Sequence, residues 1–220
     1  MILYHGSNVE VKEPKIYLTE YGRDFGPAFY LTLDLEAAKS WACKNDSLGI
    51  VNKYHIDNES YKRLNILDLT NKDKYSILNW MAILIHFRTL DTSFIKNNQL
   101  VLDWLNKYYI DVNDYDVVIG FRADDAYFRF PSRFISNDLA FEDLENIYLS
   151  GDLGVQYAFI SKRAIKLLKF DSVIECEKSF LGLYYSIISF ASKEFDELLN
   201  KPKDPNKNYV LDLMRKENEH

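Results

Sequence analysis

FGPAFYLTLDLEAAKSWACK, residues 25–44, is the stretch of sequence that decides the fold class. Residues 28–33 (AFYLTL) are rich in strand-forming side chains, and the aspartate at position 34 can cap a following helix. The helix expected over residues 35–44 has one apolar face, made of Leu35, Ala38, Trp41 and Ala42. A strand joined directly to such a helix predicts a fold that combines sheets with helices.

The rest of the chain continues with both kinds of element. Strands are expected over residues 2–5, 49–56, 115–120, 155–161 and 167–175, and helices over residues 73–89, 93–109, 138–148 and 180–199. This order predicts an α+β fold with antiparallel or mixed sheets. It also predicts one domain over residues 1–175, with a helical insertion at 73–109, followed by a helical appendage over residues 176–220.

Length and composition narrow the class of protein. The chain has 220 residues, of which 47% are hydrophobic and 27% charged, which suits a domain with a sizeable core. Cys43 and Cys176 are too few for a disulfide scaffold, and no basic and apolar leader opens the sequence. The apolar stretch 180–191 is too short to cross a bilayer. We therefore expect a cytoplasmic globular protein, and its net charge of −6 argues against general affinity for nucleic acid.

Three groups of residues could form a ligand site. His5, Gly6 and Ser7 end the first expected strand, where a histidine is more often structural than chemical and a glycine permits close approach of a ligand or a second strand. Tyr30 and Trp41 are eleven residues apart in sequence. They are either core aromatics or a slot for a flat cationic ring.

Polar residues at the ends of later strands are equally ambiguous. Gln156 lies among apolar residues and needs partners for its amide, either in solvent or in a cleft. Asp24, Asp124 and Asp125 could act as general bases or bind a metal, although aspartate more often forms turns. The histidines and cysteines lack metal-ligand spacing, so no metal site is expected.

The joint order of these motifs resembles the His-Tyr-Glu branch of the ADP-ribosyltransferase superfamily. That branch carries HG[ST], a glycine-led aromatic strand, a second aromatic residue eleven positions later and a glutamate opening a later strand. The strings LYHGS, DFGPAFYLT, AAKSWA, ADD and QYAF are closer still to a bacterial ADP-ribosyltransferase-like domain family of unknown function, often found in toxin–antitoxin-type operons. The resemblance covers about residues 3–161 and implies two packed sheets around an NAD cleft.

The resemblance assigns roles by position. His5 would hydrogen-bond the adenosine ribose of NAD, and the backbone of Gly6, in a motif completed by Ser7, would bind the nicotinamide amide. Tyr30 and Trp41 would stack on the nicotinamide ring. His5 and Tyr30 would be catalytic. The third catalytic residue would be Gln156, at the position of the family's glutamate.

Two positions depart from the family pattern. Gln156 stands where the branch has its catalytic glutamate, and Ala38 stands where the superfamily has a serine, with Ser40 out of register. A glutamine can orient a ribose hydroxyl but brings no negative charge, which predicts slower bond cleavage and transfer of single units. On this argument Gln156→Glu would raise NAD turnover.

The resulting expectation is an NAD-dependent mono-ADP-ribosyltransferase, a glycosyltransferase and toxin-like bacterial effector that modifies a protein or nucleic acid inside the cell. NAD would be its co-substrate, a neutralising antitoxin protein its partner, and no metal would be needed. Asp24, Asp124 and Asp125 would activate the acceptor. The alternatives are a catalytically weak NAD- or nucleotide-binding interaction module and an NAD hydrolase on the same fold. A phosphotransferase acting on RNA would carry arginines beside His5, and the sequence has no such pair there.

Overall fold

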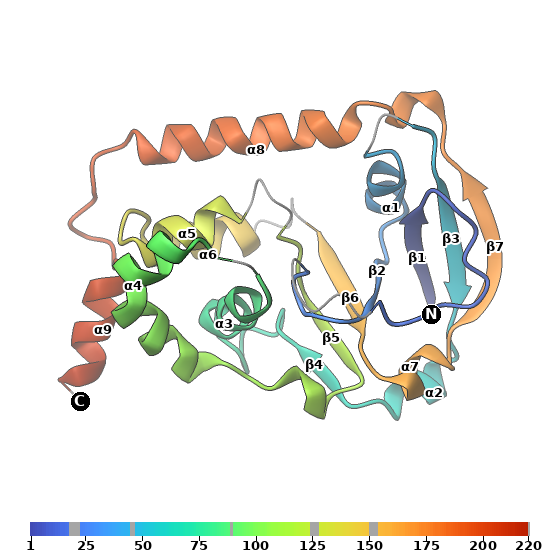
Figure 1. The fold of residues 1–220 in the computed structure, drawn as a ribbon, viewed down its shortest axis with the longest axis horizontal. Coiled ribbons are helices and arrows are strands. Elements are labelled where there is room, and N and C mark those ends of the chain that lie inside the picture. Colours follow the sequence, from blue (N-terminus) through green and yellow to red (C-terminus); the bar gives the residue numbers. More distant parts are fainter. Residues whose placement is uncertain (18–22, 45–46, 89, 124–127, 150–153, 220) are drawn as a thin grey trace.

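Two sheets stand side by side in the computed structural model, which describes residues 1–17, 23–44, 47–88, 90–123, 128–149 and 154–219 (Figure 1). The three-stranded sheet is antiparallel, in the order β1 (Ile2–Ser7), β3 (Ile50–His55) and β7 (Lys169–Glu175). The four-stranded sheet is mixed, in the order β2 (Phe29–Leu31), β6 (Val155–Phe159), β5 (Val117–Phe121) and β4 (Ile66–Asp68). Its strands pair antiparallel except for β4 and β5, which are parallel. The prediction of an α+β fold with two sheets is confirmed.

Several helices begin at a residue whose side chain caps them. Asp34 accepts hydrogen bonds from the backbone amides of Glu36 and Ala37 and so starts the first helix, as the sequence predicts. The larger described helices are α1 (Leu35–Ala42), α3 (Ile77–Phe87), α4 (Thr92–Leu105), α5 (Arg129–Ile135), α6 (Phe141–Leu149), α8 (Leu183–Leu199) and α9 (Val210–Asn218). Shorter ones are α2 (Asn58–Lys62), α7 (Lys162–Ile165) and three 3₁₀ turns at Asn106–Tyr108, Val112–Asp114 and Lys178–Phe180.

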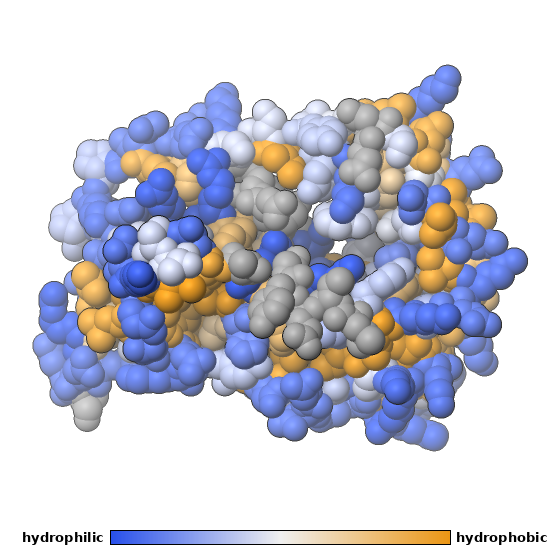
Figure 2. Space-filling model, in the orientation of Figure 1, coloured by the Kyte–Doolittle hydropathy of each residue, from blue (hydrophilic) through white to orange (hydrophobic). Residues whose placement is uncertain are grey.

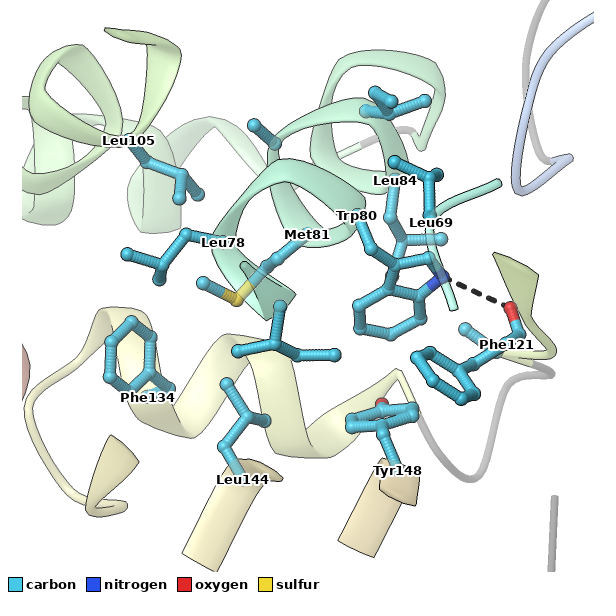
Figure 3. Close-up of a cluster of buried hydrophobic side chains, with 14 of the residues drawn as sticks. Leu69, Leu78, Trp80, Met81, Leu84, Leu105, Phe121, Phe134, Leu144 and Tyr148 are labelled. Atoms are coloured by element: carbon cyan, nitrogen blue, oxygen red, sulfur yellow. Dashed lines mark hydrogen bonds between the residues drawn. The ribbon is translucent and has the colours of Figure 1, made fainter. Parts of the chain in front are cut away.

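The main core lies between the four-stranded sheet and the helices α3 to α6, which gather on the side of that sheet away from β1, β3 and β7 (Figure 1). Trp80 of α3 is fully buried there and donates its indole N–H to the carbonyl oxygen of Phe121 across 3.0 Å (Figure 3). A second cluster fills the space between the sheets and includes Leu3, Phe29 and Ile119. Val117 and Ile119 of β5 belong to this second cluster, and Val118 and Phe121 belong to the main core, so every residue of the strand is buried.

Helix α8 crosses the top of the molecule in Figure 1, from α1 at one end to α5 at the other. Phe195 near its far end packs edge-to-face on Phe130, with ring centroids 5.0 Å apart, and belongs to the main core. Val210 of α9 is buried in the same core. The expected insertion 73–109 and the expected appendage 176–220 therefore both contribute buried side chains to the core. In the described part of the chain, no helix combines the length and apolarity needed to cross a membrane.

Candidate functional site

A cleft of about 490 Å³ opens between the two sheets and is bordered by β1, β2, α1, β6 and the start of α8. Figure 2 shows a hollow on this face, flanked by hydrophilic residues, in the region where Figure 1 has β6, β1 and α1. Six of the candidate site residues that the sequence analysis proposed line the cleft: His5, Gly6, Asp24, Tyr30, Trp41 and Gln156. The fold thus brings together side chains that are up to 151 positions apart in the numbering.

His5 is held in one tautomer by the neighbouring strand. Its Nδ1 lies 2.8 Å from the carbonyl oxygen of Tyr30, which can only accept a hydrogen bond, so Nδ1 carries the proton and Nε2 is left as an acceptor. Burial lowers the pKa of the imidazole; the hydrogen bond to Tyr30 opposes this shift, and the charge of Arg23 adds to it. His5 is therefore neutral at physiological pH.

Gly6 permits close packing of helix against strand. A Cβ atom at this position would lie 2.2 Å from the carbonyl oxygen of Ala38 and 2.9 Å from the amide nitrogen of Ala42. The sequence analysis expected a ligand or a second strand to lie close to Gly6. The structure places helix α1 there instead. Since α1 carries Trp41, this close packing brings Trp41 near β1 at the cleft.

The two aromatic residues of the expected slot both line the cleft, and cations already lie beside their rings. The Tyr30 hydroxyl donates to the Gly26 carbonyl across 2.8 Å and accepts from the Phe25 amide. Burial, with the negative charge of Asp24, raises the pKa of this hydroxyl, so it stays protonated. The Trp41 ring, 36% exposed, has Lys44 Nζ 4.0 Å from its centroid. A cationic ligand ring on that face of Trp41 would displace Lys44.

Gln156 is tied to a buried carboxylate. Its Nε2 donates to Asp24 Oδ2 across 2.6 Å and to the Phe121 carbonyl across 3.3 Å. Asp24, only 8% exposed, also accepts from the Ala123 amide and forms an ion pair with Arg88, whose Nη2 is 2.5 Å from Oδ1. Arg88 is the residue that ends α3, so the expected helical insertion supplies part of the site.

The sequence left room for a basic patch in the second half of the chain that would include Arg122, but it did not point to the other cations of the cleft. Arg23, Lys44, Arg88 and Arg122 line it, against one described carboxylate, Asp24. No arginine pair is adjacent to His5 in sequence, but the fold brings three arginines into the cleft that His5 lines. Charged side chains on separate loops carry no common sequence signal, which is why their convergence was not predicted.

Not every residue that the sequence analysis named is a described residue of the cleft. Ser7 is not among the residues lining the cleft; its hydroxyl accepts from the Val9 amide. Ala38 lines the cleft, whereas Ser40 is buried away from it. Asp124 and Asp125 lie outside the described residues. Among the described residues, no group of three or more histidine, cysteine, aspartate or glutamate side chains could hold a metal ion.

Comparison with known proteins gives one informative match. No curated protein and no solved structure matches the chain significantly. A family model described as "Protein of unknown function" matches residues 1–170, which include every described strand of the four-stranded sheet and all residues of the cleft except Tyr184. The chain therefore belongs to the family of proteins of unknown function called DUF3990.

Proposed function

We propose that this protein is an NAD-dependent mono-ADP-ribosyltransferase. The observation that carries the proposal is the convergence of His5, Tyr30, Trp41 and Gln156, from four different elements, on one cleft. These are the positions that the sequence resemblance connects with NAD. A cleft of about 490 Å³ falls within the range of about 300–1,000 Å³ that is typical of small-molecule sites.

The charge of the cleft supports a ligand with phosphate groups. Arginine and lysine side chains bind phosphate oxygens through charge-assisted hydrogen bonds, and Arg23, Lys44 and Arg122 all line the cleft. The two phosphates of NAD fit this environment better than an uncharged substrate would.

The chemistry that we propose is transfer at the bond between ribose and nicotinamide. This C–N bond breaks, nicotinamide leaves with the bonding electrons, and the ribose carbon bonds to an acceptor whose proton passes to solvent. Neutral His5 offers Nε2 as an acceptor for a ribose hydroxyl, and Tyr30 and Trp41 offer flat surfaces for the departing ring. Gln156 faces the same space from the start of β6 and would accept from a second ribose hydroxyl.

The biological setting rests on the resemblance alone. We propose a toxin-like bacterial effector that acts in the cytoplasm on a protein or nucleic acid and is restrained by an antitoxin protein. Asp124 and Asp125 stay predictions for activation of the acceptor. Asp24 is less suited to that role, because Arg88, Ala123 and Gln156 already engage both of its carboxylate oxygens.

The test is transfer of label from NAD. The protein is mixed with NAD labelled in its adenine, and bacterial lysate, RNA and DNA are offered as acceptors. Label on a macromolecule that is lost with both His5→Ala and Tyr30→Ala supports the transferase and identifies the acceptor class. Free ADP-ribose without transfer would identify an NAD hydrolase instead. NAD that binds but is not cleaved would identify an interaction module, and NAD that does not bind at all would overturn the proposal.

A further inference from the structure

We infer that Asp24 is the positioning residue for Gln156: it fixes which end of the glutamine carboxamide is offered to the ligand, and it supplies the negative charge that a glutamine lacks. This inference deepens the proposed function and rests on it, since it concerns the residue expected to contact the ribose of NAD. It concerns three side chains in contact, Gln156, Asp24 and Arg88.

The orientation of the carboxamide follows from its partners. Asp24 Oδ2 and the Phe121 carbonyl can only accept hydrogen bonds, so the atom of Gln156 that faces both of them must be the NH₂ group. Both N–H bonds of that group are used by these two acceptors. Among the described residues, none donates a hydrogen bond to Oε1. Gln156 therefore keeps an acceptor for a ligand, while its donor group is occupied.

The Phe121 carbonyl also accepts a hydrogen bond from a second side chain, which holds it in place. The indole N–H of Trp80 donates to the same oxygen across 3.0 Å, and Trp80 is fully buried in the main core (Figure 3). One of the two acceptors that orient Gln156 is thus fixed by the helix α3 and by the hydrophobic core.

Asp24 is held just as firmly. Arg88 at the end of α3 pairs with Oδ1 at 2.5 Å, and the Ala123 backbone amide donates to Oδ2 across 3.0 Å. Arg88 also donates to the Ala123 carbonyl, so one guanidinium binds both the Asp24 carboxylate and the backbone of Ala123. Asp24 is only 8% exposed, and these partners compensate for the burial of its carboxylate and fix its position relative to Gln156.

This arrangement gives a reason for glutamine rather than glutamate at position 156. A glutamate would put a second carboxylate about 2.6 Å from Asp24, where two negative charges disfavour each other strongly. A glutamine is instead polarised by Asp24. Its N–H donates a hydrogen bond to the carboxylate, and this bond increases the electron density on Oε1. The site then holds one negative charge, joined to the carboxamide of Gln156 by one hydrogen bond.

The experiment compares four variants with the unaltered protein, using nicotinamide release from NAD, NAD affinity and melting temperature. Asp24→Asn should lower the rate at least about tenfold while NAD affinity changes by less than about threefold. Asp116→Asn is the matched control, because Asp116 is equally buried, contacts Arg163 and Ser161, and does not line the cleft. It should lower the melting temperature and leave the rate unchanged.

Gln156→Glu gives the pH-dependent test, and it leaves the contacts of Asp24 with Arg88 and Ala123 in place. The introduced carboxyl group, while protonated, can donate to Asp24 as glutamine does, so the rate should be near that of the unaltered protein at about pH 5.5. The higher of the two pKa values of this carboxyl pair should be raised above the usual range of a glutamate. The rate should fall at least about tenfold as pH rises through that value. Arg88, which contacts Asp24, and Arg23 and Arg122, which line the same cleft, limit the size of this shift. The double variant Asp24→Asn/Gln156→Glu should lack the fall, because only one carboxylate remains.

The outcomes separate the two proposals. If the unaltered protein neither binds nor cleaves NAD, the proposed function is overturned and this inference with it. If it cleaves NAD but Asp24→Asn is as active as the unaltered protein, or Gln156→Glu has a flat pH profile, only this inference is overturned. The melting temperature of Gln156→Glu should also fall with rising pH relative to the unaltered protein, since its acid is protonated more strongly in the folded state. Absence of that fall would show that the two side chains are not in contact.

Discussion

His5 on β1 donates its Nδ1–H to the carbonyl oxygen of Tyr30 on β2, across 2.8 Å, although the two strands belong to different sheets. The backbone of one sheet therefore decides where the imidazole of the other carries its proton. With Nδ1 committed to Tyr30, only Nε2 is available to a ligand, and it is available only while the ring is neutral.

The first prediction concerns pH. NAD affinity should be constant from about pH 8 to about pH 6.5 and should decline at lower pH, where protonation of Nε2 removes the acceptor. The pKa of His5 is lowered in the folded protein, so the unfolded chain binds more protons below about pH 6.5. The free energy of unfolding should therefore also fall as pH drops through this range. Binding and melting curves at several pH values test both statements; His5→Gln, which does not titrate, should lack the His5 part of each dependence.

A methyl group at position 6 should disturb the site through helix α1. Gly6→Ala forces the new Cβ against the backbone of Ala38 and Ala42, which we expect to cost about 1–3 kcal/mol and to lower the melting temperature by roughly 2–12 °C. NAD affinity should fall as well, because the displaced helix carries Trp41. Leu3→Ala, which removes a buried side chain from the other face of β1, should lower stability without weakening binding. Equal effects of both variants on NAD affinity would contradict this account.

Helix α8 should contribute to binding through a single aromatic ring. Tyr184 lines the cleft and meets the Trp41 ring edge-on, with centroids 5.8 Å apart. Loss of such a pair is worth about 0.5–1.5 kcal/mol, so Tyr184→Ala should weaken NAD binding about two- to tenfold. Phe190→Ala on the same helix, 62% exposed and outside the cleft, serves as the control. Calorimetric titration of both variants decides the matter; no difference between them would remove Tyr184 from the site.

The positive charge of the cleft should make NAD binding sensitive to salt. Arg122→Gln should weaken binding about tenfold at low ionic strength and less at high ionic strength, since added salt screens the same attraction. Arg129→Gln removes a similar charge that pairs with Asp196 outside the cleft, and it should change neither affinity nor salt dependence. Binding curves at several salt concentrations provide the measurement. A salt dependence that Arg122→Gln leaves intact would argue against a phosphate contact.

Most of the fold could be predicted because its long elements carry local signals. Asp34 marks the start of α1, and the apolar periodicity of residues 73–89 corresponds to α3, which spans Ile77–Phe87. The strand β4 (Ile66–Asp68) was missed, because three residues are too short to show a pattern. Helix α5 (Arg129–Ile135) was missed as well, since it has no side-chain cap and contains Pro131.

The residues of the candidate site could be predicted only where they belong to short motifs. His5, Tyr30 and Trp41 lie in recognisable strings, and the structure brings them to the cleft. The contact between Gln156 and Asp24 joins residues 132 positions apart, and the ion pair between Arg88 and Asp24 joins residues 64 apart. Such pairs depend on how loops from separate elements meet, and no local pattern encodes them. The expectation that Gln156→Glu raises turnover was reached without the Asp24 contact, for the same reason, and the pH profile of this variant decides between that expectation and the fall in rate inferred from Asp24.

The position of α8 and α9 has a consequence for how the protein is made. Phe195 and Val210 complete a core whose other members are synthesised earlier, and Tyr184 adds the last wall of the cleft. On the ribosome, the strands of the two sheets can pair before these helices emerge, because all of the strands precede α8 in the chain. The cleft lacks Tyr184 until the start of α8 has left the exit tunnel. A nascent chain thus acquires its complete cleft only after the other residues that line the cleft have already emerged.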